Sequence, residues 1–510
     1  MRDEADWINL QQENRELREQ VAQRDGLVNQ LEQTLAQLTQ QMQQTSTQLS
    51  QEVQSLKREI KGLQDRLSKD SHNSHIPPSS DRFARQKKTK SLRQPSEKKP
   101  GAQSGHEGNT LTLVKDPDHI VSYEVETCSC CEHDLRDVAA HFIERRQVVD
   151  VPPKRWVVIE HRTEQKVCPH CQTITRTTFP AGISAPVQYG PAIGAIGVYL
   201  TQQQFLPYER ACETIQDLLG PAMTVGTLKA LVERCADHLG PIEEQIKEQL
   251  RKAEVLHEDE TGTYVMGKRW WSHVAATEQL THYAVHAKRG HEALEAIGIL
   301  PGFTGVSVHD GWATYWKYTT CQHALCNVHH LRELVFLHEQ QQQAWAGSMK
   351  TLLSDMNTAV KEARERGLKQ LDPTEVADWK AQYQTLLQEG YQANPNAPPP
   401  IDDTSKRGRR KQSATRNLLD RLSKHQEAVL RFLECFSVPF DNSQAERDIR
   451  MVKVQQKISG GFRSLPGAEA FFRIRGYLST LRKQGAHVLT ALELALAGHP
   501  VSPAFSCISN

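Results

Sequence analysis

Long apolar runs and an excess of either charge are missing from this chain. No stretch of eighteen or more apolar residues occurs, so we expect no membrane-spanning helix. Lys and Arg number 62 against 61 Asp and Glu, so the total charge indicates no partner and only local clusters can do so. The opening residues MRDEADWINL have no apolar core and no cleavage site, which argues against a signal peptide. These absences together predict a cytoplasmic protein.

Further absences exclude classes of chemistry. The sequence has no Gly-rich phosphate loop of the nucleotide-hydrolase type, so we expect no nucleotide hydrolysis. Eleven Cys in 510 residues are too few for a disulfide scaffold, so closely spaced Cys are better interpreted as metal ligands. Hydrophobic residues make up only 38 % of the chain, so part of it is expected to be extended, coiled or disordered. The length requires several domains.

Residues 8–69 contain neither Pro nor aromatic residues, and their apolar residues follow a three-to-four spacing with one shift. The seam residues are Leu10, Leu17, Val21, Val28, Leu31, Leu35, Leu38, Met42, Leu49, Val53, Leu56, Ile60, Leu63 and Leu67. Heptads with one stutter predict a coiled coil, which would join copies of the chain into a homo-oligomer. One long helix that folds back on its own chain is the alternative.

Residues 70–107 are rich in Ser, Pro, His and Lys and have no apolar periodicity, which predicts disorder. This segment contains a basic run made of Arg82, Arg85, Lys87, Lys88, Lys90, Arg93, Lys98 and Lys99. Such a run can neutralise DNA phosphates by counterion release without reading sequence. The alternative is a solvated linker.

Two C-x-x-C pairs follow, Cys128 with Cys131 and Cys168 with Cys171. Each pair can supply one edge of a zinc tetrahedron. The stretches VSYEVE, RRQVVDVP and RWVVIEHRTEQKV around them are rich in β-branched residues and predict strands. The sequence therefore predicts a structural Zn²⁺ in a zinc ribbon. Four buried thiols are the alternative, and no βαβ pattern supports a thioredoxin-like role.

Residues 190–248 have helical patterning, with a turn at Gly220-Pro221 and Thr224 as a candidate N-cap of the next helix. Two helices joined in this way are compatible with a helix-turn-helix that binds DNA. Lys229 and Arg234 are the only basic residues of the second helix, so a helical spacer is the alternative.

Three strands in succession are predicted by VLHEDETGTYVM, RWWSHVAAT and THYAVHAKRG, consistent with an antiparallel meander. A helix at HEALEAIGILP and a fourth strand at GVSVHDGW follow, and HALCNVHHLRELVFLHEQ runs from a strand into a helix. Asp259 and Asp310 therefore fall on the first and fourth strands.

A further helix is predicted to begin near Asp441, which forms a capping-box pattern with Gln444 and is the expected N-cap. Glu446 then lies inside the helix, and Arg447, Arg450 and Lys453 form its basic side, which is a candidate DNA-binding surface. A structural pair between Glu446 and Arg450 is the alternative for this acid.

Asp259, Asp310 and Glu446 form a candidate metal site. A hard divalent cation prefers oxygen ligands, and two adjacent cations require several carboxylates from separate elements. Two Asp on strands and a Glu on a later helix make the layout of a ribonuclease-H-like core. The neighbours Glu258 and Glu260 leave open which acid of the HEDE sequence binds metal.

Several short blocks in order resemble one protein family. They are Lys99-Pro100-Gly101, Gly105-His106-Glu107-Gly108, Leu206-Pro207-Tyr208, Asp259-Glu260-Thr261, His309-Asp310-Gly311-Trp312, His323-Ala324-Leu325-Cys326-Asn327, Arg332-Glu333-Leu334, Asp441-Asn442 and Ala445-Glu446-Arg447. The chain resembles bacterial insertion-sequence transposases of the insertion-sequence-sixty-six family, which are of the DDE type.

The resemblance implies an enzyme that cuts and joins DNA strands. It implies two Mg²⁺ (or Mn²⁺) ions held by Asp259, Asp310 and Glu446. The partners implied are double-stranded DNA, both element ends and target, in a bacterial nucleoid-associated protein. A catalytically decayed DNA-binding protein and a nuclease that only hydrolyses DNA are the alternatives.

The predicted fold class is multidomain α+β, with a coiled coil, a zinc ribbon, a helical domain and a ribonuclease-H-like α/β core with a helical insertion. The predicted division is 1–70 coiled coil, 71–107 basic disordered linker, 108–182 zinc ribbon, 183–248 helical domain with a possible helix-turn-helix, 249–340 first part of the core, 341–430 helical insertion, 431–482 second part of the core, and 483–510 C-terminal tail.

Overall fold

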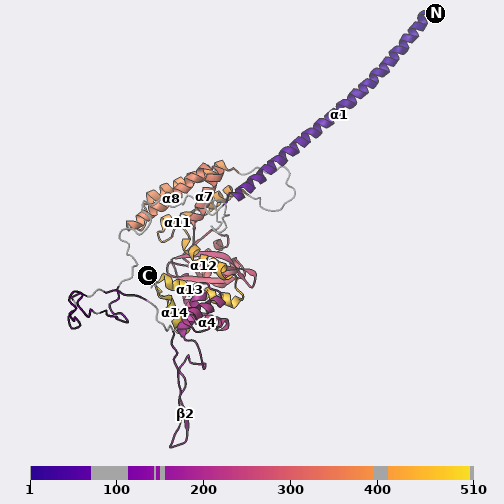
Figure 1. Cartoon of the computed structure of the whole chain (residues 1–510). Coiled ribbons are helices and arrows are strands. Elements are labelled where there is room, and N and C mark those ends of the chain that lie inside the picture. Colours follow the sequence, from indigo (N-terminus) through magenta and orange to yellow (C-terminus); the bar gives the residue numbers. More distant parts are fainter. Residues whose placement is uncertain are drawn as a thin grey trace. The chain divides into compact units, whose positions relative to one another are not determined.

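A computed structural model describes residues 2–69, 113–123, 125–139, 141–142, 145–149, 156–395 and 412–505. Figure 1 gives the order of its elements, whose mixture of helices and sheets confirms the multidomain α+β class. The chain divides into two compact units: the first comprises Met1–Ala84, His329–Asp355 and Ala377–Ser423, and the second Arg85–Val328, Met356–Val376 and Lys424–Asn510. The predicted basic run from Arg82 to Lys99 lies outside the described residues. In the described part of the chain no helix is long and apolar enough to cross a membrane.

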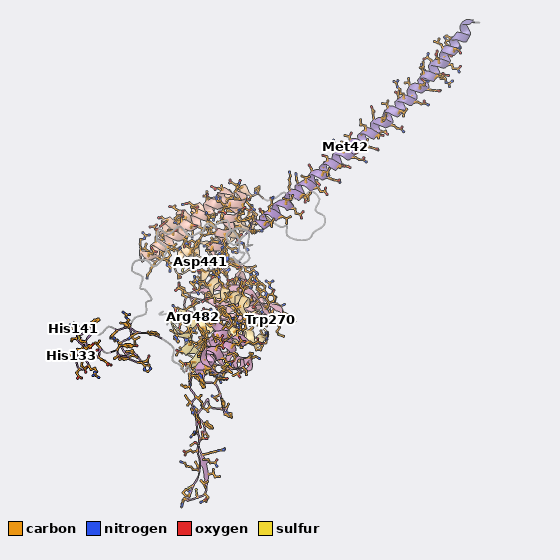
Figure 2. The ribbon with its side chains drawn as sticks, in the orientation of Figure 1. Met42, His133, His141, Trp270, Asp441 and Arg482 are labelled. Atoms are coloured by element: carbon orange, nitrogen blue, oxygen red, sulfur yellow. The ribbon has the colours of Figure 1, made fainter. Side chains whose placement is uncertain are left out.

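The first unit begins with α1 (Arg2–Leu67), a single helix of 66 residues. Its side chains, Met42 among them, stand out from the helix in Figure 2. The predicted seam residues are exposed to between 47 % and 73 % of their surface, so this apolar stripe has no cover along most of its length. At its C-terminal end, Asp65 accepts a hydrogen bond from Gln341 Nε2 at 3.1 Å.

Helices occupy most of the described residues from 327 to 434, as the sequence predicts for residues 341–430. They are α7 (Asn327–Gln341), α8 (Ala344–Glu365), α9 (Pro373–Ala393), α10 (Ala414–Lys424) and α11 (Gln426–Glu434). In the first unit the Tyr383 hydroxyl of α9 donates to the Leu422 carbonyl of α10 at 3.0 Å, which ties these two helices together.

The second unit contains a five-stranded sheet. Its strands are β3 (Val255–Val265), β4 (Lys268–Ala276), β5 (Thr281–His286), β6 (Val306–His309) and β7 (Gln322–Leu325). Their order across the sheet is β5-β4-β3-β6-β7, antiparallel from β5 to β3 and parallel from β3 to β7. The predicted antiparallel meander is confirmed, and the first and fourth strands, β3 and β6, lie side by side.

Helices cover this sheet and form the hydrophobic core beside it. They are α2 (Pro191–Val198), the π-helix η2 (Tyr199–Gln203), α3 (Tyr208–Leu219), α4 (Val225–His238), α5 (Gly240–Arg251), α6 (His291–Ile297), the 3₁₀ turns η3 (Leu300–Gly302) and η4 (Tyr315–Lys317), α12 (Ser443–Ser459), α13 (Leu465–Lys483) and α14 (Val488–Leu496). Thr224 caps α4 as predicted, because its hydroxyl accepts the Thr227 N–H at 3.2 Å. The DNA-binding role of α3 and α4 stays a prediction.

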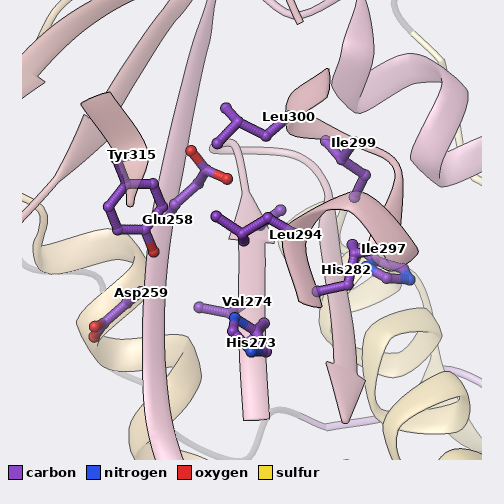
Figure 3. A pocket seen from close by; sticks show the side chains of 11 residues that line it. Glu258, Asp259, His273, Val274, His282, Leu294, Ile297, Ile299, Leu300 and Tyr315 are labelled. Carbon is purple, nitrogen blue, oxygen red and sulfur yellow. The ribbon is translucent and has the colours of Figure 1, made fainter. Parts of the chain in front are cut away.

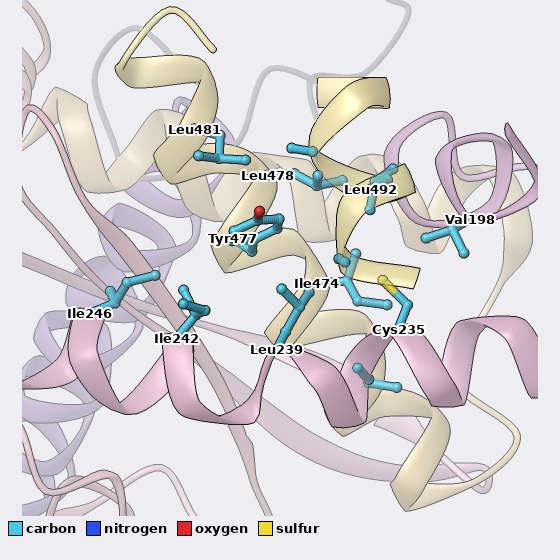
Figure 4. Close-up of a cluster of buried hydrophobic side chains, with 14 of the residues drawn as sticks. Val198, Cys235, Leu239, Ile242, Ile246, Ile474, Tyr477, Leu478, Leu481 and Leu492 are labelled. Atoms are coloured by element: carbon cyan, nitrogen blue, oxygen red, sulfur yellow. The ribbon is translucent and has the colours of Figure 1, made fainter. Parts of the chain in front are cut away.

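A large apolar cluster lies between α4, α5, α13 and α14 (Figure 4). Leu239, Ile474 and Leu492 are at most 1 % exposed there. α14 belongs to the stretch assigned to a C-terminal tail, yet it buries Ala491, Leu492 and Ala495 in this cluster. Burial of such side chains supplies most of the stability of a domain, at about 25 cal/mol per Å² of apolar surface.

Helix α13 packs directly on the edge strand β5. A side chain on Gly476 would place its Cβ 3.2 Å from the Thr281 carbonyl, so the lack of a side chain permits this close approach. The Thr480 hydroxyl accepts the Thr281 N–H at 2.9 Å. Lys483 pairs with Asp448 of α12 at 2.9 Å, which links the two helices that cover the sheet.

The segment before α2 contains little regular structure. β1 (Gln165–Val167) and β2 (Ile174–Arg176) form a two-stranded antiparallel sheet around the second Cys pair. The strands predicted in VSYEVE, RRQVVDVP and most of RWVVIEHRTEQKV do not form in their described residues. A strand needs a partner and an apolar surface to cover, and Val148 and Val157 are 91 % and 76 % exposed instead.

Candidate functional site

Asp259 on β3 lies level with Asp310, which directly follows the neighbouring strand β6. β3 and β6 run parallel with Val255 opposite Val306 and His257 opposite Val308. The same register carried two residues further places Asp259 opposite Asp310. Because side chains alternate between the faces of a strand, both carboxylates point to the face on which His257 lies.

Glu446 lies in the first turn of α12, and its Oε1 is 3.7 Å from the Cys326 thiol, which donates to it. Among the described residues, the ligand oxygens of Asp259, Asp310 and Glu446 do not all lie within 4.8 Å of one another. Asn442, just before α12, accepts a hydrogen bond from His257 Nδ1 at 2.9 Å and donates to the Glu258 carbonyl at 2.7 Å. These bonds fix the start of α12 against β3. Burial raises the pKa of Asp259 well above its usual range, and the negative charges of Glu260, Asp310 and Glu446 add to this rise. This repulsion supports the placement of the three acids in one region of the second unit.

The three consecutive acids of β3 have different surroundings. Glu258 is fully buried and accepts a hydrogen bond from the Ser307 hydroxyl at 2.5 Å. Glu260 accepts from the Tyr315 hydroxyl at 2.5 Å and pairs with Arg289 at 2.6 Å. Figure 3 shows the Asp259 carboxylate pointing away from that of Glu258. Asp259 forms no ion pair with Lys or Arg among the described residues. Of the three acids, it is therefore the one whose carboxylate remains open to a cation.

Burial raises the pKa of Glu258 to about 8, with Glu260 contributing and the Ser307 hydrogen bond opposing. Because the pKa of Asp259 is raised as well, protonation does not distinguish these acids. Of the three acids in this sequence, Asp259 is the one whose carboxylate has no side-chain partner among the described residues, which leaves it open to a metal.

The loop after β6 holds Asp310 through its neighbours. Asp310 Oδ1 accepts the Trp312 N–H at 2.8 Å, and His309 Nδ1 accepts the Gly311 N–H at 3.0 Å. The opposite nitrogen of His309 then donates to His323 Nδ1 at 3.0 Å. Burial lowers the pKa of His309 well below its usual range, so the ring is neutral and keeps these fixed hydrogen-bonding roles.

Sequence reasoning missed the supporting role of His309 and Tyr315. His309 stacks on Tyr315 with ring centroids 4.5 Å apart, and both side chains are buried beneath the acids. The signal available in the sequence was the dense run HDGWATYW, in which polar and aromatic residues follow a buried strand. The residues on other elements that contact this run could not be identified from the sequence.

The predicted N-cap of α12 is wrong. The cap residue is Asn442, and Asp441 Oδ1 accepts the N–H of Ser443 two residues ahead at 2.8 Å. Asp441 therefore forms a turn before the helix rather than a capping box. The side chain of Asn442 is occupied by His257 and the Glu258 carbonyl, so tertiary contacts outweigh the local capping preference.

One exposed side of α12 is basic, as predicted. Arg447, Arg450, Lys453 and Lys457 are exposed and recur at helical spacing. None of the four forms an ion pair within the described ranges, so their charges are open to phosphates. The alternative of a structural pair between Glu446 and Arg450 is not formed. Lys453 does donate a hydrogen bond to the Gly262 carbonyl.

The two Cys pairs form turns of the same construction. Cys128 N–H donates to the His133 carbonyl and Cys168 N–H to the Thr173 carbonyl, both at 2.9 Å. Hydrogen bonds from the backbone of Cys130 and Cys131 lower the pKa of the Cys128 thiol. Among the described residues, no three of the four predicted ligands have their sulfur atoms within 4.8 Å of one another. The thiols are partly or fully exposed, which excludes the alternative of buried structural thiols.

The residues of each turn nevertheless suit zinc. Both turns place a non-Gly residue at positive φ after the second Cys, Glu132 at 57° and Gln172 at 61°, so they present their thiols in the same way. A lowered thiol pKa favours the thiolate, which is the form that binds a metal. Two such turns would supply the four thiolates that a closed structural zinc site needs.

Comparison with known protein families gives matches for the Cys segment and for the part of the chain that contains the acids. The zinc-finger binding domain of transposase IS66 matches residues 126–172, which contain both Cys pairs and support a structural zinc. A family of unknown function matches residues 4–112. Curated proteins give no match. The Transposase IS66 family matches residues 186–470, more than half of the chain and all three acids. The chain therefore belongs to the IS66 family of transposases, nucleotidyl-transfer enzymes that act on DNA.

Proposed function

We propose that this transposase cuts and joins the DNA ends of an insertion sequence through Asp259, Asp310 and Glu446, with two Mg²⁺ or Mn²⁺ ions as cofactors. The observation that carries the proposal is the strand register that aligns Asp259 of β3 with Asp310 just after the parallel strand β6, together with the negative charge of Glu446 on α12, which acts on Asp259. The strand order β5-β4-β3-β6-β7 supports a ribonuclease-H-like core, in which the acids occupy the centre of the sheet.

The three carboxylates fit a pair of hard cations by their chemistry. Oxygen ligands from separate elements are what Mg²⁺ prefers, and bound cations relieve the repulsion that raises the pKa of Asp259. When bound, such ions stabilise the charge on the attacking and leaving oxygens of a phosphodiester and lower the pKa of an attacking water.

The chain's own residues then position the reacting groups. The turn of Asp310, Gly311 and Trp312 and the contact of Asn442 with His257 hold the carboxylates in place before DNA arrives. Water attacks the scissile phosphorus, and the bond to the 3′ oxygen breaks and leaves a 3′-OH. In the joining step, that 3′-OH attacks a target phosphodiester and releases a second 3′-OH. Neither step needs a Ser or Tyr nucleophile or an external energy source.

DNA contact and assembly complete the proposal. Arg447, Arg450 and Lys453 would bind phosphates beside the acids, together with the basic run Arg82, Arg85, Lys87, Lys88, Lys90 and Arg93. The exposed seam of α1 would pair with that of a second copy, because a mobile element has two ends. Light scattering of the chain with and without residues 1–70 tests the pairing, and an equal subunit number in both would contradict it.

The catalytic proposal is tested with a DNA fragment that carries the element's ends, with and without Mg²⁺. Asp259→Ala, Asp310→Ala and Glu446→Ala should each reduce cleavage by about a thousandfold or more, about 4 kcal/mol of transition-state stabilisation. DNA binding should persist because Lys and Arg carry it. Glu292→Ala, which removes an exposed carboxylate of the same unit, is the matched control and should cut normally.

The outcomes separate the alternatives. Wild-type cutting by any one of the three variants would show that its acid is wrongly assigned. Hydrolysis with no joined products would indicate a nuclease. Binding without any Mg²⁺-dependent cutting by the wild-type chain would indicate a decayed enzyme.

A further inference from the structure

Two arginines and two tryptophans form an alternating stack beside the acids. The guanidinium of Arg269 lies over the Trp271 ring, 4.7 Å from its centroid. Arg289 lies over the same ring at 5.0 Å and over the Trp312 ring at 4.2 Å. We call Arg269, Trp271, Arg289 and Trp312 the arginine–tryptophan stack. Its members come from β4, the turn after β5 and the loop after β6, so only the fold brings them together.

The centre of the stack is anchored to the strand that holds Asp259. Arg289 donates from Nε and Nη2 to Glu260 Oε1, at 2.9 and 2.6 Å, and Glu260 also accepts from Tyr315. Glu260 follows Asp259 directly in β3. The pairing fixes Arg289 between the two rings, and it neutralises the charge of this one arginine.

The far end of the stack is fixed to Asp310. The Trp312 N–H donates to Asp310 Oδ1 at 2.8 Å, so the aromatic ring starts two residues from that carboxylate. Both tryptophans are partly exposed, although a Trp of a soluble protein is usually well covered. The stack therefore has part of its aromatic surface in solvent beside Asp310, on the face of β3 opposite to the Asp259 carboxylate.

The stack and the basic side of α12 both reach Gly262 of β3. Gly262 has no side chain, and the Arg269 guanidinium lies against it on one face of the strand. Lys453 of α12, which packs on the other face, donates to the carbonyl of the same Gly262. Arg269 forms no ion pair within the described residues, so its charge remains uncompensated. Positive charge is thus present on both faces of β3 at this point, and the aromatic rings extend from Arg269 to Asp310.

We propose that the arginine–tryptophan stack binds unpaired nucleotides of the DNA strand next to the scissile phosphate. The inference rests on the proposed function and extends it to the form of the DNA at the active site. Bases expose their faces only where the duplex is opened, and such faces stack on Trp and Arg, whereas phosphates bind the uncompensated cations. A surface that binds intact duplex DNA needs only the cationic side chains, because the bases of a duplex keep their faces covered.

The test measures binding rather than cleavage, with the full chain and no added Mg²⁺. The probes are a fluorescent oligothymidine of about 20 nucleotides and a blunt duplex of equal length, compared by anisotropy. Trp312→Leu, which keeps apolar bulk and removes the ring, should weaken oligothymidine binding about tenfold, the effect of losing one stacked base. Trp312→Phe should retain most of it, and duplex binding should change little in either variant.

Two further variants sharpen the result. Trp271→Leu should reproduce the selective loss, while Trp7→Ala, which removes an exposed tryptophan from α1, should leave both probes unaffected. A 2-aminopurine base within the oligonucleotide should lose fluorescence on the wild-type chain and keep it on Trp312→Leu. Thermal unfolding of each variant identifies any general loss of structure.

Equal binding of oligothymidine by wild type and Trp312→Leu would overturn the proposal. Equal weakening of both probes, with Trp312→Phe no better than Trp312→Leu, would overturn it as well, because the residue would then act only through the fold. Neither result bears on cutting by the three acids. Conversely, a chain that never cuts DNA can still show selective binding to the stack.

Discussion

The core of the second unit and the segment that carries the Cys pairs are stabilised in different ways. In the core, Leu256 and Val308 are fully buried and every strand has a partner. In the described residues between 113 and 188, almost every residue is exposed, and Val148 and Val157 stand in solvent. A core of this size holds itself by burying apolar surface, whereas so small a segment needs a metal to hold it. The core is therefore stabilised by its own contacts, and we expect the Cys segment to depend on metal coordination.

Zinc removal should have the largest effect, and only on the Cys segment. Purified chain should contain about one zinc ion, and Cys128→Ser should lose it together with about 10 kcal/mol of binding energy that holds the segment. Metal analysis and hydrogen exchange of residues 126–172 measure this. Cys130→Ser, an exposed neighbour outside both pairs, is the matched control. Zinc-free protein after native purification, or equal loss in Cys130→Ser, would contradict the assignment.

Truncation of an apolar side chain should destabilise the core but not the Cys segment, the reverse of what zinc removal does. Leu256→Ala removes a fully buried leucine from β3 and should lower the free energy of unfolding by about 3 kcal/mol, from lost burial and a cavity. Val157→Ala in the Cys segment removes an exposed side chain and should change it by less than about 0.5 kcal/mol. Urea unfolding followed by tryptophan fluorescence compares them, and similar losses would refute the distinction.

A buried ion pair should make the stability of the core depend on pH. Glu243 bonds to Arg473 at 2.6 Å and lies 3.3 Å from His282. Burial alone would raise the pKa of Glu243, but the hydrogen bonds and charges of these partners outweigh it and lower the pKa to about 2. A depressed pKa stabilises the fold above the unfolded value and loses this effect as pH falls through the folded value.

Glu243→Gln should therefore destabilise the core by about 2 kcal/mol near neutral pH, and the difference should shrink from about pH 4.5 towards pH 2. Unfolding curves across this range measure it. Asp134→Asn in the Cys segment breaks an exposed pair with Arg136 and serves as the control, with no measurable change in core stability. A difference that is constant with pH would rule out the linkage.

Loss of a helix cap should give the smallest effect. Thr224→Ala removes the hydroxyl that accepts the Thr227 N–H and should cost about 1 kcal/mol. Thr224→Ser keeps the hydroxyl and should behave nearly as wild type. Thermal unfolding of the two variants checks it, and identical curves for Ala and Ser would show that the cap contributes nothing.

The core strands were predictable because their patterns are strong and agree with their tertiary surroundings. β3, β4 and β5 alternate or bury their residues over at least six positions, and each has an adjacent partner in sequence. The Cys segment has β-branched stretches of similar composition, and there the strand prediction was wrong. Composition indicates that a stretch can become a strand, but only a partner and an apolar surface make it one.

In the candidate site, too, some features could be predicted from local sequence and others could not. The positions of Asp259 and Asp310 on strands and of Glu446 on a helix could be predicted from local pattern. The different surroundings of Glu258 and Glu260 could not, because Ser307, Tyr315 and Arg289 reach them from three other elements. Asp441 shows the same limit, since the cap that its sequence favours is displaced by contacts of Asn442.

By itself, the sequence determined the heptad seam of α1, the Cys spacing, the order of the core strands and the family to which the chain belongs. These features are local, since each depends on residues a few positions apart. Tertiary structure alone decided which acid of β3 has an uncompensated charge, that α14 joins the core, and that Arg269, Trp271, Arg289 and Trp312 stack. The physical reason is that burial, pairing and stacking are set by neighbours in space, and those neighbours come from distant parts of the chain.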